Sequence, residues 1–311
     1  GSRFYSPEDE ARIVRILCEW LADSAWVKIG NNAGYYDRLV MWFRYGVWAK
    51  RVLDTTLLHR CVEGELPHDA GYIGSRYTDV HRWKRGNPAL NAASIEIEAE
   101  YNMRDCKVPM EAAGVMLRDM QALGHDHGPE LLRGDHELQE LCAEMHIVGM
   151  PIHQGMRSWY EQDQEAVVRE KLAQLRVLSD DPEHNPNSPP QVGKLLYDRW
   201  DLPILVRTDT GRPATNIEAL VGLRRLRSCP PYAMRYIEAL RDYREADKVL
   251  GTYLRPTAPG ELDPGGKGGC ILYPDGFVHP DWKAHVPVTG RFSSGRWNNQ
   301  NVPIWLRVMV W

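Results

Sequence analysis

Apolar residues recur at helical spacing in several long segments of the chain, and short strand-like stretches separate some of them. Residues 7–23 have an amphipathic pattern, which Ser6 can cap and which Pro7 can begin. Residues 26–29 have the composition of a strand, and a polar turn and a helix from about Tyr36 follow. Strand, polar turn and helix in this order predict an α/β unit at the start of the chain.

The middle of the chain is predicted to be mainly helical. Residues 92–122 carry apolar positions on one face, whereas residues 123–136 contain Gly, His and Asp and predict a loop or a domain boundary. From about residue 138 we expect helices only. They cover 156–178 and 231–250, and two shorter ones follow capping boxes at Ser188–Gln191 and Thr215–Glu218.

The last part of the chain has a different pattern. Residues 256–268 are rich in Pro and Gly and predict a linker, and strand-like pieces follow at 270–273 and 277–279. The apolar end, residues 304–311, predicts a strand that would be an aggregation-prone edge if it had no partner. This pattern favours a partner chain or further sequence over a free terminus.

Composition limits the class of protein. The 311 residues suffice for two or three domains, and the hydrophobic fraction of 43% with a net charge of −4 is typical of a folded soluble protein. No apolar run approaches the length of roughly 20 residues that a membrane span needs, and no signal peptide is visible. Six scattered cysteines without a C-x-x-C pair predict reduced thiols, so we expect a cytoplasmic protein.

Several residues of metal-ligand type lie between positions 125 and 146. They are His125, His127, His136, Cys142 and His146. Their spacing fits no zinc pattern. We therefore interpret this region as a polar interdomain loop rather than a metal site.

Two short motifs carry candidate nuclease chemistry. Asn32, Tyr36 and Asp37 form an N-x-x-x-Y-D pattern, and Tyr101 and Asp105 form a Y-x-x-x-D pattern. Positions i and i+4 share one face of a helix, so Tyr101 and Asp105 are expected to point at one site. Carboxylates can hold two divalent ions that activate a water, and such hard oxygen ligands favour Mg²⁺ or Mn²⁺. Surface charges on helices would account for each motif taken alone.

The segment 286–303 has little aliphatic material to bury. It contains two arginines and a cluster of amides, which are Arg291, Arg296, Asn298, Asn299, Gln300 and Asn301. Short donors of this kind reach phosphate oxygens and the minor-groove acceptors that all base pairs share. An ordinary surface loop would have a similar composition.

The helix predicted over 231–250 adds a candidate basic stripe. Arg241, Arg244 and Lys248 have the spacing of one helix face, opposite the apolar face. Such a stripe can neutralise phosphates and predicts salt-dependent binding. The acidic residues between them, including Asp242 and Asp247, leave a solvated helix face as the alternative.

Taken together and in this order, the motifs resemble those of the family A DNA polymerases, the DNA polymerase I type, including phage-type members. The nuclease motifs are similar to those of its 3′–5′ exonuclease domain, and N-x-N-S at 185–188, T-G-R at 210–212 and Y-R-E at 243–245 resemble its thumb. The segment 286–303 resembles the start of its palm.

The resemblance implies an α/β ribonuclease H-like exonuclease domain over 1–137 with its N-terminal part missing. A mostly α-helical thumb over 138–255 and the first strands of an α+β palm over 256–311 would follow.

The resemblance also implies residue roles. Asp37, Tyr101 and Asp105 are the implied catalytic residues, and Asp37 and Asp105 are the implied ligands of Mg²⁺ or Mn²⁺. The implied DNA contacts are Asn32, Asn185, Ser188, Arg244, Lys248, Thr252, Arg291, Asn298, Gln300, Asn301 and Arg307. The family's D-x-E motif is absent from residues 1–30, so we expect little or no exonuclease activity from this chain alone.

The expected function is template-dependent DNA synthesis, to which this chain contributes the grip on DNA. The metal-binding aspartates of the polymerase centre are expected beyond residue 311, so the chain is not expected to polymerise by itself. Primer–template DNA is the expected partner. The dNTPs would bind through the missing palm and fingers, which a second chain could carry. The alternatives are a stand-alone 3′–5′ exonuclease and a non-catalytic DNA-binding subunit of a split polymerase.

Overall fold

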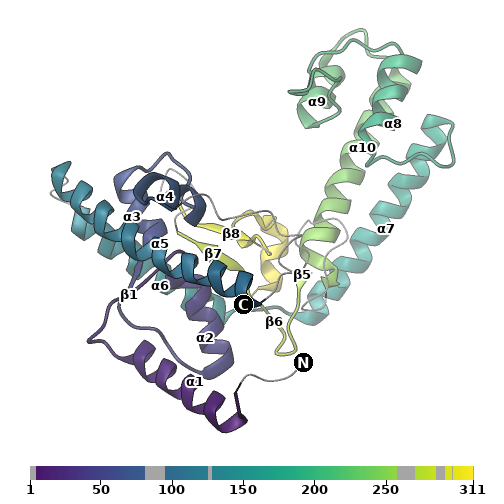
Figure 1. Ribbon diagram of the computed structural model, residues 1–311. Helices are drawn as coiled ribbons and strands as arrows, with labels where there is room; N and C mark the ends of the chain where they lie inside the picture. The colour runs from purple at the N-terminus through teal and green to yellow at the C-terminus, as the bar shows by residue number, and fades with distance from the viewer. Residues whose placement is uncertain are drawn as a thin grey trace. The chain divides into compact units, whose positions relative to one another are not determined.

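The computed structural model describes residues 5–80, 95–124, 128–257, 270–284, 291–295 and 297–310. The chain folds as two compact units. Unit 1 comprises Gly1–Gly149 and Pro280–Gly295, and unit 2 comprises Met150–His279 and Arg296–Trp311 (Figure 1). No helix within the described ranges has both the length and the apolar character needed to cross a membrane.

Unit 1 is built mainly from helices. In chain order its elements are α1 (Pro7–Ala22), β1 (Lys28–Gly30), the π-helix η1 (Ala33–Asp37), α2 (Arg38–Tyr45), β2 (Val52–Asp54), α3 (Thr55–Val62), α4 (Ala70–Tyr77), α5 (Ile95–Ala122), α6 (Gly128–Val148), β7 (Asp281–Lys283) and β8 (Ser293–Gly295). Helix α1 begins as the sequence predicts, because the Ser6 hydroxyl accepts a hydrogen bond from the Asp9 amide and Pro7 occupies the first turn.

Two short strand pairs belong to unit 1. Strands β1 and β2 are parallel, and the register places Gly30 opposite Asp54, at the carboxyl ends of both strands. Strands β7 and β8 are antiparallel and pair Trp282 with Ser294. The strand–turn–helix order predicted near residue 30 is therefore present, while the ribonuclease H-like domain as a whole stays a prediction.

The core of unit 1 forms between α3, α4 and α5. The side chains of Leu57, Leu58, Ile73, Ala112 and Met116 are essentially inaccessible to solvent. These apolar residues come from three helices that pack closely, and α5 also contacts β1 while α3 contacts β2.

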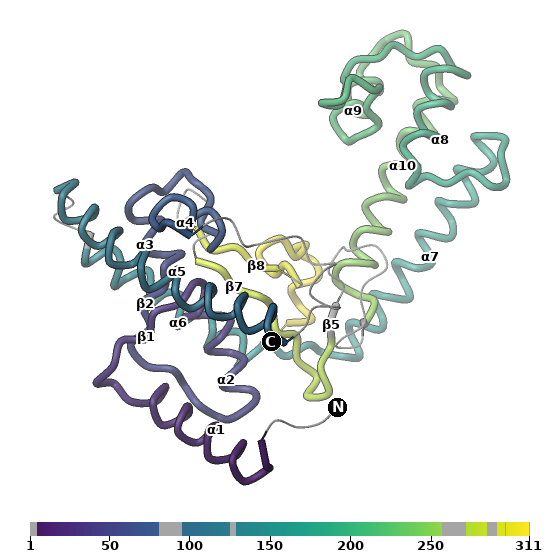
Figure 2. The backbone as a smooth tube through the Cα atoms, in the orientation of Figure 1, coloured from purple at the N-terminus to yellow at the C-terminus, as the bar shows by residue number. Residues whose placement is uncertain are grey.

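Unit 2 contains a long helical pair. Its elements are β3 (Met150–Pro151), α7 (Gln154–Ser179), α8 (Pro189–Gly193), the π-helix η3 (Lys194–Arg199), α9 (Ile217–Arg225), α10 (Pro231–Val249), the π-helix η4 (Leu250–Leu254), β4 (Pro256–Thr257), β5 (Cys270–Ile271), β6 (Phe277–Val278) and the 3₁₀ helices η5 (Asn299–Asn301) and η6 (Ile304–Met309). Helices α7 and α10 run antiparallel, side by side (Figure 2). The Lys171 ammonium lies 3.5 Å from the Asp242 carboxylate across this pair.

Two apolar clusters stabilise the helical pair, one at each end. At the end that carries α8 and α9, Leu196 and Leu220 are buried in one cluster with Tyr236 of α10. At the other end, Leu250 and Trp297 belong to a second cluster that includes residues of η4, η6 and the strand β6. The amphipathic pattern of 231–250 therefore packs along its whole length, as α10 and η4.

The structure corrects the prediction of a loop over 123–136. Helix α6 begins at Gly128, with Pro129 in its first turn, and it continues to Val148. The predicted domain boundary after residue 137 therefore falls inside a helix, and the compact units divide between Gly149 and Met150. The assignment of the chain to an exonuclease-like domain, a thumb and the start of a palm stays a prediction.

Three local predictions in unit 2 also need correction. Residues 304–309 form a 3₁₀ helix and not a strand, with Leu306 and Met309 buried three residues apart on one side. The cap of α9 is Asn216 and not Thr215, since the Asn216 side chain accepts from the Ala219 amide. Ser188 occupies the N-cap position of α8, but its side chain makes no capping hydrogen bond.

Candidate nucleic-acid interface and carboxylate pocket

A tight turn after β1 carries the first predicted nuclease motif. Asn32 has a left-handed backbone, with φ of 59°, and the π-helix η1 follows directly. Gly34 approaches the side chain of Gln139 so closely that an added Cβ would lie 1.9 Å from the Gln139 Oε1 atom. A larger residue at this position would have to displace the buried Gln139 side chain where the turn passes α6.

The carboxylate of Asp54 holds this turn in place. It is fully buried, and its Oδ1 atom accepts hydrogen bonds from the amides of Asn32 at 2.8 Å and Thr56 at 3.0 Å. Its Oδ2 atom accepts from the Gly34 amide at 3.1 Å and from the Gln139 side chain at 2.8 Å. Asp54 is also the N-cap of α3, so one side chain connects β2, the η1 turn, α3 and α6.

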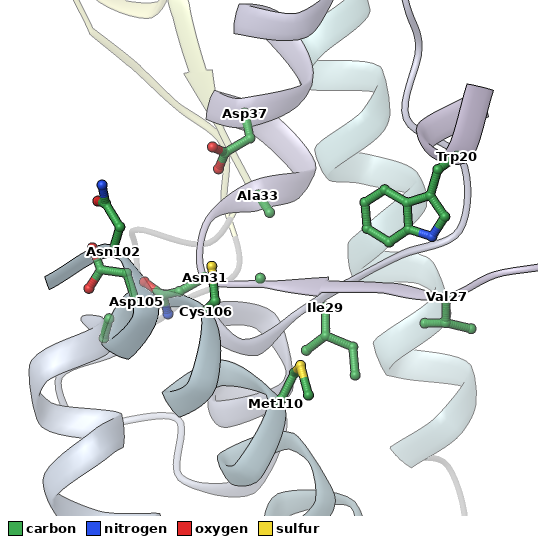
Figure 3. Close-up of a pocket in the computed structure, with 12 residues that line it drawn as sticks. Trp20, Val27, Ile29, Asn31, Ala33, Asp37, Asn102, Asp105, Cys106 and Met110 are labelled. Carbon is green, nitrogen blue, oxygen red and sulfur yellow. The ribbon is translucent and has the colours of Figure 1, made fainter. Parts of the chain in front are cut away.

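A pocket of about 860 Å³ lies beside the same turn (Figure 3). Asp37 from η1 and Asp105 from α5 both line it, although the two residues are 68 positions apart in the sequence. Asn102 of α5 and Asn31 add polar groups to the lining. The apolar part of the lining consists of Trp20, Val27, Ile29 and Met110, with Gly30, Ala33, Ala70 and Cys106 completing it. The structure thus brings together the two predicted carboxylates, while Tyr101 lies one helical turn before Asp105 on α5.

The ionisation of Asp37 depends on its surroundings. Loss of solvent around the carboxyl group raises the pKa of Asp37, and the nearby Asp54 carboxylate adds to this effect. Both influences disfavour the charged form. A cation placed near Asp37 would relieve them, and so would a proton.

The residues of metal-ligand type form no cluster of three among the part of the chain that the structure describes. Asp54 already accepts four hydrogen bonds and faces the η1 turn. His136 accepts from the Asp54 amide through Nε2, and His146 lies 3.6 Å from Asp281, so these two residues of α6 serve different contacts. His125 and His127 lie outside the described residues.

In unit 2, the predicted DNA-contact segment 185–188 lies between α7 and α8 and forms a compact turn. The Asn185 side chain accepts from the Asn187 amide at 2.9 Å, and the Ser188 amide donates to the Asn185 carbonyl at 3.0 Å. Gln191, which the sequence pairs with Ser188, instead accepts from the Asn185 amide at 2.7 Å. The turn is therefore closed by its own backbone and by α8.

Helix α10 fixes the turn from the other side through Arg244. The Arg244 guanidinium donates to the Pro186 carbonyl through Nε at 3.0 Å and through Nη2 at 2.9 Å. Its Nη1 donates to the carbonyl of Thr215, immediately before α9. Partial burial lowers the pKa of Arg244 relative to an exposed arginine. The sequence could not indicate these partners, because they lie 58 and 29 residues away.

The other predicted DNA contacts occupy varied positions. Lys248 is exposed on α10, and Thr252 is half-buried in η4. Asn298 and Gln300 lie around η5, where Asn301 is exposed. Arg307 is exposed on η6, with its Nε donating to the Val302 carbonyl at 3.3 Å.

Arg291 is exposed and belongs to unit 1, whereas Asn185, Ser188, Arg244 and the residues of the previous paragraph belong to unit 2. Asn299, next to two predicted contacts, donates to the Met150 sulfur. Residues 285–290 and Arg296, which the resemblance includes, lie outside the described residues.

The comparisons with known proteins all find DNA polymerases of one family. The sequence model described as DNA polymerase family A matches residues 158–309. DNA polymerase I of Pseudomonas aeruginosa is 33% identical over 321 aligned positions, which cover 95% of this chain and 32% of that protein. DNA polymerase I of Lactococcus lactis subsp. cremoris is 29% identical over 261 residues, which cover 82% of this chain and 26% of that protein.

A phage enzyme and a solved structure extend the comparison. The DNA polymerase of Bacillus phage SP01 is 29% identical over 119 residues, 38% of this chain and 11% of that protein. The POL domain of Pol1 from M. smegmatis, solved in complex with DNA primer-template and dNTP, superposes with a TM-score of 0.67 at 22% identity. That match covers 97% of this chain and 46% of the other, and it shows a shared fold.

The chain spans between 21% and 32% of the length of the first DNA polymerase I relatives. The shared sequence pattern covers the α7–α10 helical pair and continues through η4 to η6. Residues 158–309 therefore belong with the family A DNA polymerases, and the chain is similar to DNA polymerase I proteins over most of its length.

Proposed function

We propose that this chain holds a primer–template duplex for template-dependent DNA synthesis by a family A DNA polymerase. One observation carries the proposal. The predicted DNA contacts from residue 185 onward belong to one compact unit, with the single exception of Arg291, and this unit contains most of the residues that the family model matches. Unit 2 would act as the thumb and the beginning of the palm, and unit 1 as an exonuclease-like domain.

The chemistry of binding follows from the residue types. Exposed Lys248 and Arg307 can neutralise phosphates, and the amides around η5 can donate to phosphate or minor-groove acceptors. Contacts of this kind do not distinguish one base sequence from another, which suits an enzyme that must accept every template. Binding of dNTPs and nucleotidyl transfer are not assigned to any residue of this chain.

The carboxylate pocket of unit 1 supports the proposal of an exonuclease-like domain whose catalytic site is incomplete. If a divalent ion such as Mg²⁺ or Mn²⁺ binds in this pocket, Asp37 and Asp105 are the two carboxylates of the lining that could contact it. The third nearby carboxylate, Asp54, has its lone pairs engaged by four donors within the fold. The donor set does not suffice for a two-metal site. We therefore propose that this chain alone has little or no 3′–5′ exonuclease activity, which argues against a stand-alone exonuclease.

A variant comparison tests the proposed grip. Lys248→Ala and Asn301→Ala are expected to weaken binding of a fluorescent primer–template duplex, and Lys107→Ala serves as the control. Lys107 is an exposed lysine on α5 of unit 1 that pairs with Glu111. Loss of the Lys248 phosphate contact is expected to weaken binding several-fold and to lower the slope of log Kd against log salt by about 0.9, whereas loss of the uncharged Asn301 side chain weakens binding without changing the slope. Equal effects of Lys248→Ala and Lys107→Ala would contradict the assignment of the grip to unit 2.

A further inference from the structure

Arg244 lies between two loops that resemble separate motifs of the thumb in the sequence. Its three donor atoms reach the carbonyls of Pro186 and Thr215, which belong to the turn before α8 and to the loop before α9. Both carbonyl-bearing residues are buried. A planar guanidinium presents donors in a fixed fork, so it can fix two backbone segments at once.

A second residue of α10 binds the same turn. The Asp247 carboxylate accepts a hydrogen bond of 3.0 Å from the Asn187 side chain. Arg244 and Asp247 are three residues apart on α10 and therefore share one helix face. Together they contact Pro186 and Asn187, the two residues between Asn185 and Ser188. The turn is thus attached to α10 by one cationic and one anionic side chain.

This arrangement leaves little of Arg244 for a phosphate. The guanidinium is half-buried, and its fork is occupied by backbone carbonyls at hydrogen-bonding distance. A direct phosphate contact would have to break these bonds and leave buried carbonyls without a donor, which is costly. Lys248, one turn further along α10, is exposed and has no such constraint.

We infer that Arg244 is a positioning residue, which holds the 185–188 turn and the loop before α9 in the arrangement that binds duplex DNA, and that Asp247 assists it. The inference rests on the proposed function of unit 2 as a DNA grip. It reassigns Arg244 from a direct phosphate contact to a residue that acts through Asn185, Ser188 and the loop that ends at Thr215.

Salt dependence separates the two roles of Arg244. A residue that contacts phosphate contributes about 0.9 to the slope of log Kd against log salt, whereas a positioning residue changes Kd at a constant slope. We expect Arg244→Ala to weaken primer–template binding about tenfold with the wild-type slope. Arg244→Lys is expected not to restore affinity, because an ammonium cannot occupy both carbonyl sites. Rescue by lysine together with a reduced slope for Arg244→Ala would overturn the inference.

Asp247→Ala tests the positioning role without any change to Arg244, because the two explanations of binding predict opposite changes in DNA affinity. If charge alone governs binding, removing an anion from this surface strengthens DNA binding. If Asp247 positions the turn, Asp247→Ala weakens binding, by about threefold for one lost hydrogen bond. Tighter binding by this variant would overturn the positioning role, even if Arg244→Ala proved too unstable to measure.

A double variant connects Arg244 to the turn itself. Ser188→Ala is expected to weaken binding in the wild-type background and to have a smaller effect in Arg244→Ala, since the turn is already displaced there. Additive effects would contradict action through the turn. If the wild-type chain fails to bind the duplex at low salt, the proposed function fails as well. Binding by the wild type with a slope change for Arg244→Ala overturns only the positioning role.

Discussion

Replacing Asp54 with alanine removes one acceptor group that serves four hydrogen bonds inside unit 1. The donors are the amides of Asn32, Gly34 and Thr56 and the side chain of Gln139, at 2.8 to 3.1 Å. The carboxylate is fully buried, and a water that entered the vacated space could accept only two of the four hydrogen bonds. The η1 turn, the start of α3 and α6 are therefore all expected to loosen.

The magnitude follows from the number of bonds. A net loss of about 1 kcal/mol for each bond gives a destabilisation of about 4 kcal/mol. The matched control is Asp69→Ala. Asp69 is the N-cap of α4, but it is exposed and its side chain accepts one bond, from the Tyr72 amide at 3.0 Å. Loss of such a cap is expected to cost about 1 kcal/mol.

Pulse-labelling hydrogen exchange across a urea series measures the stability of unit 1 separately from unit 2. With a dependence of about 2 kcal/mol per M urea, Asp54→Ala should lower the unfolding midpoint of unit 1 by about 2 M and Asp69→Ala by about 0.5 M. The midpoint of unit 2 should stay unchanged in both variants. An Asp54→Ala shift no larger than that of Asp69→Ala would refute the role of Asp54 as the common acceptor.

Two further predictions concern pH. Because the pKa of Asp37 is raised in the folded state, its ionisation disfavours folding, and the stability of unit 1 falls as pH rises through that pKa. Asp37→Asn is thus expected to raise the urea midpoint at pH 7. At about pH 2.5 the carboxyl is neutral in both states, so a difference that persists there would contradict this cause. His59 is fully buried, with its Nδ1 atom 2.7 Å from that of His68, and burial lowers the pKa of both rings. Since the folded pKa of His59 lies below the unfolded value near 6.5, its contribution is present above that pH and is lost as pH falls through the folded pKa. The urea midpoint of unit 1 should therefore drop between pH 7.5 and 5, less so in His59→Phe, and an equal drop in the variant would exclude this histidine as the cause.

Local patterns in the sequence suffice for the elements whose signals lie within a few residues. Ser6 and Pro7 predict the start of α1, and the apolar spacing from Tyr236 to Leu250 predicts α10. The helix α6 could not be predicted in this way, because Gly128 and Gly134 are poor helix formers. Burial of apolar residues such as Leu132 against the core of unit 1 outweighs that preference.

The end of the described chain illustrates a second limit. The apolar run from Ile304 predicts a strand by composition, but Leu306 and Met309 are buried three residues apart, which suits a 3₁₀ helix. Composition alone cannot distinguish a spacing of two from a spacing of three when neighbouring positions are also apolar. Val310 is in extended conformation and bridges to Ile152.

In the candidate sites, too, local motifs identify some residues, whereas the roles of others depend on partners far away in the sequence. The motifs identify Asp37 and Asp105, and the fold brings both to one pocket, while their catalytic role stays a prediction. The roles of Asp54 and Arg244 depend on partners far away in the sequence, such as Gln139 and Pro186. No local pattern contains that information, because a charged side chain that organises a buried turn looks the same in sequence as one that binds a ligand.

The central claim is that unit 2 grips a primer–template duplex through phosphate contacts. The most direct test is the Kd of the wild-type chain for a fluorescent primer–template duplex between 50 and 200 mM salt, where loss of about 10³-fold in affinity would correspond to roughly six phosphate contacts. We predict measurable binding at low salt with a steep, linear dependence of log Kd on log salt. Absence of binding at the lowest salt, or a Kd that does not change with salt, would contradict the account.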